Sequence, residues 1–292
     1  MQSGLNMWHF ISEQISECIQ QDFICDDIRE VKAGMSHKAY KISDGKQRFF
    51  VKTNEKIYLP NFEAEAEGLK HFSSTQLFKV PKIICTGLVS GHSFLVLEHI
   101  AMTRGDEQGW FQFGQALAEL HKSNTQQMYG WQEDNFIGLT PQSNLWQKKW
   151  NCFFAEQRIG FILQLLAEKG HLLANIDAVV DSVKHLLSGH NPTASMLHGD
   201  LWQGNTGFYK NQPVLFDTAF HFGDRETDLA MTELFGRFPE SFYQGYADIW
   251  PLEMDYEYRK SVYQLYHVLN HALLFGGHYL DSAKITLKNL DN

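Results

Sequence analysis

The chain has 292 residues, of which 43% are hydrophobic and 20% are charged. This length allows one large domain or two modest domains with cores of their own, and the composition is that of an ordered globular protein. The formal net charge is −9. A chain this acidic lacks the basic face that contacts with nucleic-acid phosphates require, which argues against nucleic acid as the main partner.

The four cysteines, Cys18, Cys25, Cys85 and Cys152, are scattered without a C-x-x-C pair. We therefore expect free thiols in a reducing compartment rather than a disulfide framework or a zinc site. The first residues lack the basic stretch and apolar core of a signal peptide, and no run approaches the roughly 18 apolar residues of a membrane helix. We expect a cytoplasmic protein that does not bind a membrane.

Taken in chain order, the first hundred residues are predicted to be mostly strands. Apolar residues at helical spacing predict a helix over residues 7–19. Pro60 begins a second helix that is rich in glutamate. Strand-like runs lie at residues 28–32, 38–43, 48–53, 82–89 and 93–97.

Helical periodicity dominates after about residue 100. Helices are expected near residues 110–120, 145–166 and 176–187, a short β interruption surrounds residues 197–217, and three or more helices follow. The pattern predicts an α+β, bilobal fold, with a small β-rich N-terminal lobe (1–100) and a larger, mostly helical C-terminal lobe (101–292). A nucleotide is expected in the cleft between the lobes.

The most informative segment is 197–205, Leu-His-Gly-Asp-Leu-Trp-Gln-Gly-Asn. Its pattern, His198-x-Asp200-x-x-x-x-Asn205, has the spacing of a phosphotransferase catalytic loop, and Asp217 follows a strand-like run twelve residues after Asn205. Transfer of a phosphoryl group to a hydroxyl needs one carboxylate beside that hydroxyl, and an amide oxygen and a second carboxylate that hold Mg²⁺ on the phosphates. This trio predicts a kinase that uses ATP and Mg²⁺.

A kinase also needs a lysine on a strand of the first lobe. Lys52 ends the apolar run Phe49-Phe-Val-Lys and precedes the glutamate-rich helix, as a phosphate-binding lysine would. Glu63, Glu65 and Glu67 alternate on that helix, so they cannot all face Lys52, and the pattern alone leaves the choice open.

Three further features fit a kinase more weakly. Gly34 lies where a turn would cover the phosphates, and the segment Glu98-His99-Ile100 ends the β-rich part where the hinge that contacts adenine should lie. Asp228, near the start of a later helix, either caps that helix or turns inward with His198 to support the catalytic loop.

These residues give the chain a strong resemblance to the fructosamine kinase (ketosamine-3-kinase) family, whose fold is similar to that of protein kinases. The resemblance runs nearly end to end. Its segments are Phe49–Lys52, Phe62–Glu65, Leu95–His99, Leu117–His121, Asp134–Gly138, Gln142–Asn144, Trp150, Phe153, Arg158, Leu197–Asn205, Gly223–Met231, Phe242–Tyr243 and Leu265–His271.

The resemblance implies a role for each matching residue. Asp200 would be the catalytic base, Asn205 and Asp217 the Mg²⁺ ligands, and Lys52 the phosphate-binding lysine. It favours Glu65 as the partner of Lys52 and makes residues 98–100 the adenine-contacting hinge. The implied reaction is phosphorylation of the 3-hydroxyl of ketoamines, such as ribulosamines and fructosamines, on free amino acids or protein lysines, which is a repair of glycation.

Two positions depart from the family pattern. Thr218 follows the metal-binding aspartate where the family usually has proline, which puts the stiffness of that turn in doubt. Ala33 stands where the family often has glycine, which bears on ATP affinity.

The substrate residues are less well defined. Trp202, His267, Asn270 and His271 are either sugar contacts or buried packing and satisfied core groups. The alternatives to a ketoamine kinase are a related kinase for an aminoglycoside, choline or another sugar, and a non-catalytic nucleotide-binding regulator. The Leu265–His271 string disfavours the former, and the presence of Lys52, Asp200, Asn205 and Asp217 disfavours the latter.

Overall fold

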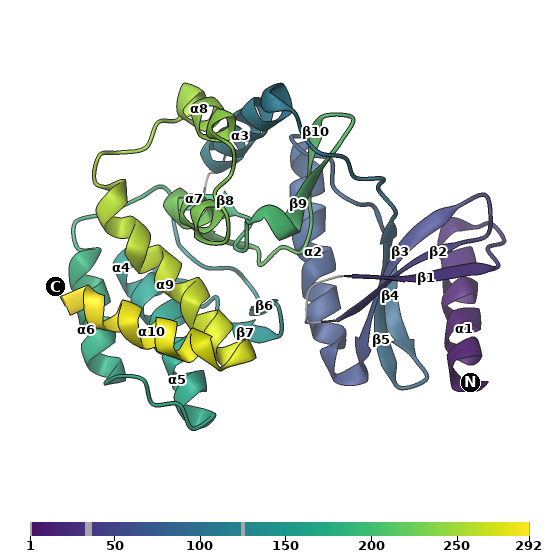
Figure 1. Ribbon diagram of the computed structural model, residues 1–292, viewed down its shortest axis with the longest axis horizontal. Helices are drawn as coiled ribbons and strands as arrows, with labels where there is room; N and C mark the ends of the chain where they lie inside the picture. The colour runs from purple at the N-terminus through teal and green to yellow at the C-terminus, as the bar shows by residue number, and fades with distance from the viewer. Residues whose placement is uncertain (1, 33–36, 124–125, 292) are drawn as a thin grey trace. The chain divides into compact units, whose positions relative to one another are not determined.

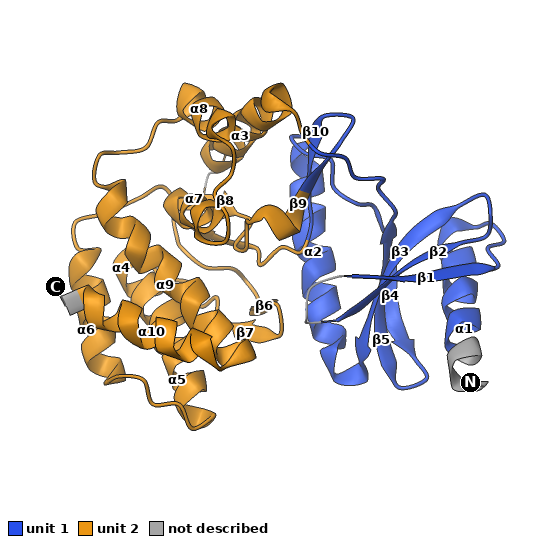
Figure 2. Cartoon of the chain, viewed as in Figure 1, with its two compact units in different colours: residues 1–104, 207–216 blue, residues 105–206, 217–292 orange. Residues whose placement is uncertain are grey.

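The computed structural model describes residues 2–32, 37–123 and 126–291. It divides into two compact units, coloured in Figure 2: residues 1–104 with 207–216, and residues 105–206 with 217–292. The expected boundary after residue 100 did not foresee that residues 207–216 belong to the first unit. That segment reaches the first unit through backbone hydrogen bonds, from Lys79 N to Pro213 O (2.9 Å) and from Thr103 N to Phe208 O (2.7 Å).

The first unit is built on a five-stranded antiparallel sheet with strand order β1-β2-β3-β5-β4. Its strands are β1 (Asp27–Val31), β2 (Lys38–Ser43), β3 (Arg48–Glu55), β4 (Ile83–Val89) and β5 (His92–Glu98). Its helices are α1 (Gln2–Ile19), a 3₁₀ turn (Lys56–Tyr58) and α2 (Leu59–Thr75), and the hairpin of β9 (Thr206–Tyr209) and β10 (Gln212–Leu215) completes it.

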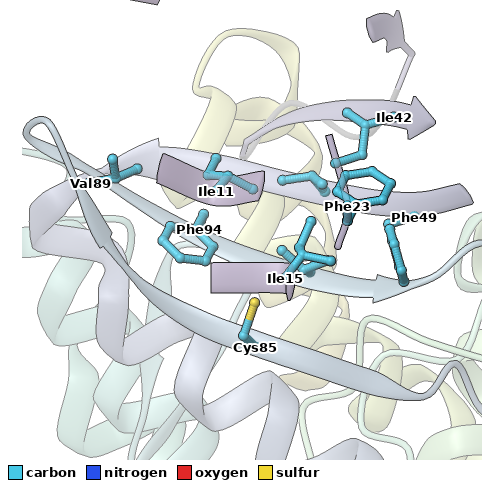
Figure 3. Packing of buried hydrophobic residues seen from close by; sticks show 10 residues of the cluster. Ile11, Ile15, Phe23, Ile42, Phe49, Cys85, Val89 and Phe94 are labelled. Carbon is cyan, nitrogen blue, oxygen red and sulfur yellow. The ribbon is translucent and has the colours of Figure 1, made fainter. Parts of the chain in front are cut away.

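The two faces of this sheet are covered by different helices (Figure 1). Ile11 and Ile15 of α1 pack on one face in a buried apolar cluster, which Figure 3 shows together with Phe49 of β3 and Phe94 of β5. Val51 belongs to the same cluster. Because side chains alternate along a strand, the next residue, Lys52, points to the opposite face, where its ammonium group meets α2.

The second unit is mostly helical. Its elements are α3 (Glu107–Lys122), β6 (Asn135–Ile137), β7 (Thr140–Gln142), α4 (Trp150–Cys152), a π-helix (Phe153–Gly160), α5 (Phe161–Glu168), α6 (Ile176–Leu186), β8 (Ser195–Leu197), a 3₁₀ turn (Gln203–Asn205), β11 (His221–Gly223), α7 (Arg225–Leu234), α8 (Glu240–Ile249), α9 (Tyr256–Phe275), α10 (His278–Lys288) and a 3₁₀ turn (Asn289–Asp291). The helix expected over residues 145–166 begins only at Trp150 and passes through the π-helix.

Two glycines allow α3 and α8 to cross at close range. A Cβ at Gly114 would lie 1.9 Å from the carbonyl oxygen of Phe242, and one at Gly245 would lie 2.0 Å from that of Phe111. Both neighbours are backbone atoms, so a change of side-chain rotamer cannot relieve either clash. Among the described residues, no helix combines the length and apolar character that a membrane span requires.

We expect Gly245→Ala to destabilise the protein by about 2–3 kcal/mol, since overpacking against backbone forces the helices apart. The exposed neighbour on the same helix supplies the control: Gln244→Ala should change stability by less than about 0.5 kcal/mol. Urea unfolding of the two variants measures both values. Equal stability of the two variants would show that the contact between α3 and α8 can accommodate the added methyl group.

Candidate active site

The loop after β8 holds the predicted catalytic aspartate. β8 pairs antiparallel with β11, and the chain then turns at Gly199 with φ of +81°. A Cβ at this position would lie 2.1 Å from the carbonyl oxygen of Ala219, so the turn requires glycine. The 3₁₀ turn returns Asn205, whose Nδ2 donates to Oδ2 and to the backbone oxygen of Asp200, both at 2.9 Å. Neither bond uses the carbonyl oxygen of the Asn205 side chain.

Asp228 holds the backbone of this loop in place. Its two carboxylate oxygens accept hydrogen bonds from the backbone N–H groups of His198 (2.7 Å) and Gly199 (2.8 Å). A third partner is the ring of His121, whose Nε2 lies 3.3 Å from Oδ2. Burial alone would raise the pKa of Asp228, but the hydrogen bond and charge of His121, with the loop contacts, lower it. Of the two readings of Asp228, the structure therefore places it inside, against the loop.

Asp200 lies in a site where ionisation is unfavourable. Its side chain is 21% exposed. Burial raises the pKa of Asp200 to about 7; the hydrogen bond from Asn205 opposes this rise, and the charges of Asp217 and Asp228 add to it. The structure thus brings Asp200, Asn205 and Asp217 together in the second unit, as carboxylates and an amide around one short loop.

Asp217 lies in a bend, two residues after the end of β10 at Leu215. Its φ of +56° is in the left-handed region, which few residues with a side chain adopt, although aspartate does so more readily than most. Ala219, two residues later, donates its N–H to the carbonyl oxygen of His198 at 2.8 Å. The turn that carries Asp217 is therefore joined by its backbone to the catalytic loop.

The predicted substrate residues fall into two groups. His267 is buried, and its Nδ1 lies 3.9 Å from Oδ1 of Asp200; burial lowers the pKa of His267 to about 3, so its ring is neutral. The ring of His271 stacks on the ring of Phe235, with their centroids 4.3 Å apart. The ring centroid of Phe235 lies 6.3 Å from that of Trp202, which is half-buried.

Asn270 differs from the other three candidates. It is buried, and its side-chain carbonyl accepts a hydrogen bond of 2.6 Å from the hydroxyl of Thr140. This hydrogen bond accounts for the carbonyl oxygen of the amide but not for its Nδ2 group. The role of Asn270 as a substrate contact stays a prediction.

Lys52 forms a buried ion pair within the first unit. Its Nζ lies 2.7 and 2.8 Å from the two carboxylate oxygens of Glu65, and the lysine side chain is only 3% exposed. Glu63 is exposed, and Glu67 contacts Lys70 and His71 on its own helix. Of the three glutamates that the sequence left open, Glu65 is the partner.

The hinge candidates end β5. The carboxylate of Glu98 forms an ion pair with Lys79, with 2.8 Å between Oε1 and Nζ. Burial, and then the charges of Lys41 and Arg48, lower the pKa of His99, while Ile100 is buried. The positions of Gly34 and Ala33 lie outside the described residues.

Sequence reasoning gave no role to several buried polar residues around this site. His121 contacts Asp228, and Asn135, Gln142 and Arg158 belong to a buried hydrogen-bond network in the same unit. The signal was present, because each belongs to a segment that carries the family resemblance. A shared segment does not say which partner its side chain meets, since those partners lie far away in the sequence.

We expect Asp228→Asn to cost about 3 kcal/mol at neutral pH, because one loop N–H would face an amide group instead of a carboxylate oxygen. A lowered folded-state pKa gives stability that is present above the unfolded-state pKa near 4 and is lost as the pH falls through the folded value. The difference between wild type and variant should therefore shrink below about pH 4. Urea unfolding from pH 3 to 7 measures it, with the exposed Asp181→Asn as control for charge. A difference that stays constant with pH would contradict the role of the carboxylate.

Comparisons with known proteins identify the family of this chain. The family model for fructosamine kinase matches residues 7–292. A probable ketoamine kinase of Vibrio parahaemolyticus is 45% identical over 285 residues, which cover 97% of this chain and 99% of that protein. The crystal structure of a protein assigned as a fructosamine-3-kinase, from Haemophilus somnus, has a TM-score of 0.94 and 34% identity, with 100% of both chains covered.

A more distant match concerns the fold alone. An aminoglycoside phosphotransferase, solved as a ternary complex with AMP-PNP and hygromycin B, has a TM-score of 0.65 at 13% identity and covers 94% of this chain and 96% of that one. The predicted α+β, protein-kinase-like fold and the family resemblance are thereby confirmed. The chain belongs to the fructosamine kinase family and is a phosphotransferase.

Proposed function

We propose that this protein transfers the γ-phosphoryl group of ATP to the 3-hydroxyl of ketoamines, carried by free amino acids or by protein lysines. The observation that carries the proposal is the grouping of Asp200, Asn205 and Asp217 around the loop after β8. The family membership supports it, and the relatives named as ketoamine or fructosamine kinases point to the substrate class.

Asp200 is proposed to be the catalytic base. A base must be deprotonated and within hydrogen-bond reach of the hydroxyl that attacks. Asn205 fixes the carboxylate through Oδ2, which leaves Oδ1 to accept the proton of the acceptor hydroxyl. The neutral ring of His267 lies on that side of the carboxylate without a hydrogen bond to it, so it does not compete for Oδ1.

The donor set near Asp200 fits Mg²⁺, which prefers oxygen ligands from one or two carboxylates together with substrate phosphates. Asp217 would supply a carboxylate and Asn205 its unused amide oxygen. When bound, the ion would neutralise charge on the phosphates. Lys52, oriented by Glu65, is proposed to bind phosphate oxygens, and the backbone of Glu98–Ile100 is proposed to contact adenine.

The groups near Asp200 suit a neutral sugar. Trp202, Phe235 and His271 offer aromatic surface, and aromatic rings suit the apolar faces of sugars. Burial lowers the pKa of His271 as well as that of His267, so neither ring adds the positive charge that a phosphorylated substrate would require. A cytoplasmic location is proposed with this activity, since ATP and reduced thiols are both found there.

We expect Asp200→Asn to abolish turnover while nucleotide binding stays within about twofold of wild type. Loss of a general base lowers rates by about 10²–10⁴-fold, and Asp200 is not proposed to contact ATP. Steady-state kinetics and calorimetry with AMP-PNP measure the two quantities. A kcat above about a tenth of the wild-type value would remove Asp200 from this role.

The substrate class is tested by ATP consumption with ribulose-lysine, fructose-lysine, choline and kanamycin side by side, each with and without Mg²⁺. We expect phosphorylation of the ketoamines with Mg²⁺ present and little turnover of choline or kanamycin, because the relatives that match nearly the whole chain are named as ketoamine or fructosamine kinases. Faster turnover of choline or kanamycin than of ribulose-lysine would assign the protein to a different small-molecule kinase activity.

A further inference from the structure

The turn that carries Asp217 needs support that its own sequence does not provide. Asp217 is held at a φ of +56°. Thr218, the next residue, does not fix its backbone as a proline would. Its hydroxyl is buried and has no hydrogen-bond partner among the described residues. Groups outside the turn supply hydrogen bonds to the backbone that follows Asp217.

Two buried amides supply hydrogen bonds to the backbone directly after Asp217. Nε2 of Gln142 donates to the carbonyl oxygen of Ala219 at 3.2 Å, and Nδ2 of Asn135 donates to that of Phe220 at 2.6 Å. Gln142 is 1% exposed and Asn135 is 7% exposed. Together with the bond from Ala219 N to the catalytic loop, they hold the segment from both sides.

The hairpin of β6 and β7 places the two amides next to each other. Its strands have three residues each, and Asn135 lies directly opposite Gln142 in the register. Nε2 of Gln142 also donates to Oδ1 of Asn135 at 2.8 Å. Such a short pair of strands has little stability of its own, so its position depends on these buried hydrogen bonds.

A second layer of contacts fixes the orientation of both amides. Oδ1 of Asn135 accepts from Gln142 and also from Nδ2 of Asn144 (2.9 Å), so its Nδ2 must be the group that faces Phe220 O. Oε1 of Gln142 accepts from the hydroxyl of Tyr266 (2.9 Å), which turns its Nε2 toward Ala219 O. Arg158 holds Asn144 in turn, with its NH2 group 2.8 Å from Oδ1.

We propose that Asn135 and Gln142 are positioning residues for Asp217: their side-chain amides clamp the backbone at Ala219 and Phe220, so that the Asp217 carboxylate is presented to a divalent cation in a single orientation. The inference rests on the proposed role of Asp217 as a metal ligand. It gives a function to the motifs Asp134–Gly138 and Gln142–Asn144, which catalysis itself does not use. A residue that orients a metal ligand typically contributes 10- to 100-fold to metal affinity.

The test is calorimetry of AMP-PNP binding, once in Mg²⁺ and once in EDTA. Gln142→Met keeps the length of the side chain but removes both donors. We expect it to weaken nucleotide binding in Mg²⁺ about tenfold and to change binding in EDTA by less than about twofold. The Mg²⁺ concentration for half-maximal turnover should rise by a similar factor, and excess Mg²⁺ should restore most of kcat.

Tyr263→Phe is the matched control. Tyr263 lies on α9, is buried in the same unit, and donates to Asp224 at 2.6 Å, but it makes no hydrogen bond to residues 217–220 among the bonds the structure describes. Removing its hydroxyl should lower the melting temperature without changing the Mg²⁺ dependence. Equal effects of Tyr263→Phe and Gln142→Met on binding in Mg²⁺ would overturn the inference, because general destabilisation would then explain both.

Two further variants keep the test decisive. If Gln142→Met does not fold, Tyr266→Phe leaves Gln142 in place and removes only the bond that orients it, so a smaller rise in the Mg²⁺ requirement is expected. The absence of any rise in a folded Tyr266→Phe would count against the clamp. Asp217→Ala separates the two proposals: if it leaves binding in Mg²⁺ unchanged, the metal role of Asp217 is wrong, whereas if only Asp217→Ala weakens binding, the clamp is wrong.

Discussion

The geometry of the second unit depends on one buried carboxylate, that of Asp228. A buried charge is strongly unfavourable unless hydrogen bonds replace the water it has lost. Asp228 finds these donors in two consecutive backbone N–H groups of the catalytic loop and in the ring of His121. The loop can supply both N–H groups only when it turns sharply at Gly199, and that turn brings Ala219 against it. The position of the loop, and of the turn that carries Asp217, follows from this requirement.

The second unit adds a buried polar network to an apolar core of its own. In the first unit, apolar side chains of α1 and of the sheet pack together on one face, as Figure 3 shows, and the charged pair of Lys52 and Glu65 lies on the other face. In the second unit, amides and an arginine are buried in a connected network, from Arg158 through Asn144 to Asn135. An apolar core packs in many similar ways, whereas a buried network is favourable only when each member meets its partner. Such a network suits a region that is proposed to hold catalytic atoms in fixed positions.

How much the sequence could predict depended on whether the signal was local. Strands β1 to β5, the start of α2 and helix α3 were predicted to within a few residues, because their periodicity and turn residues lie within the elements themselves. The hairpin of β6 and β7 was missed because three-residue strands carry no periodicity. The π-helix at Phe153–Gly160 has a helical pattern, and its wider turn was not visible in that pattern. That residues 207–216 belong to the first unit depends on contacts with residues 79 and 103, which no local pattern encodes.

The chemistry of the candidate site was likewise only partly predictable from the sequence. Spacing alone could group Asp200, Asn205 and Asp217, since the reaction requires their side chains to act together. It could not show that burial, opposed by the hydrogen bond from Asn205, raises the pKa of Asp200 to about 7, nor that the charges of Asp217 and Asp228 contribute. The carboxylate of Asp228 accepts hydrogen bonds from two backbone N–H groups, whereas that of Asp200 accepts one from the side chain of Asn205. A cation ligated by Asp217 would favour the ionised form of Asp200 through simple attraction. The position of the Asp217 turn would then control both the binding of the cation and the protonation of the base, which is why its hydrogen bonds matter beyond stability.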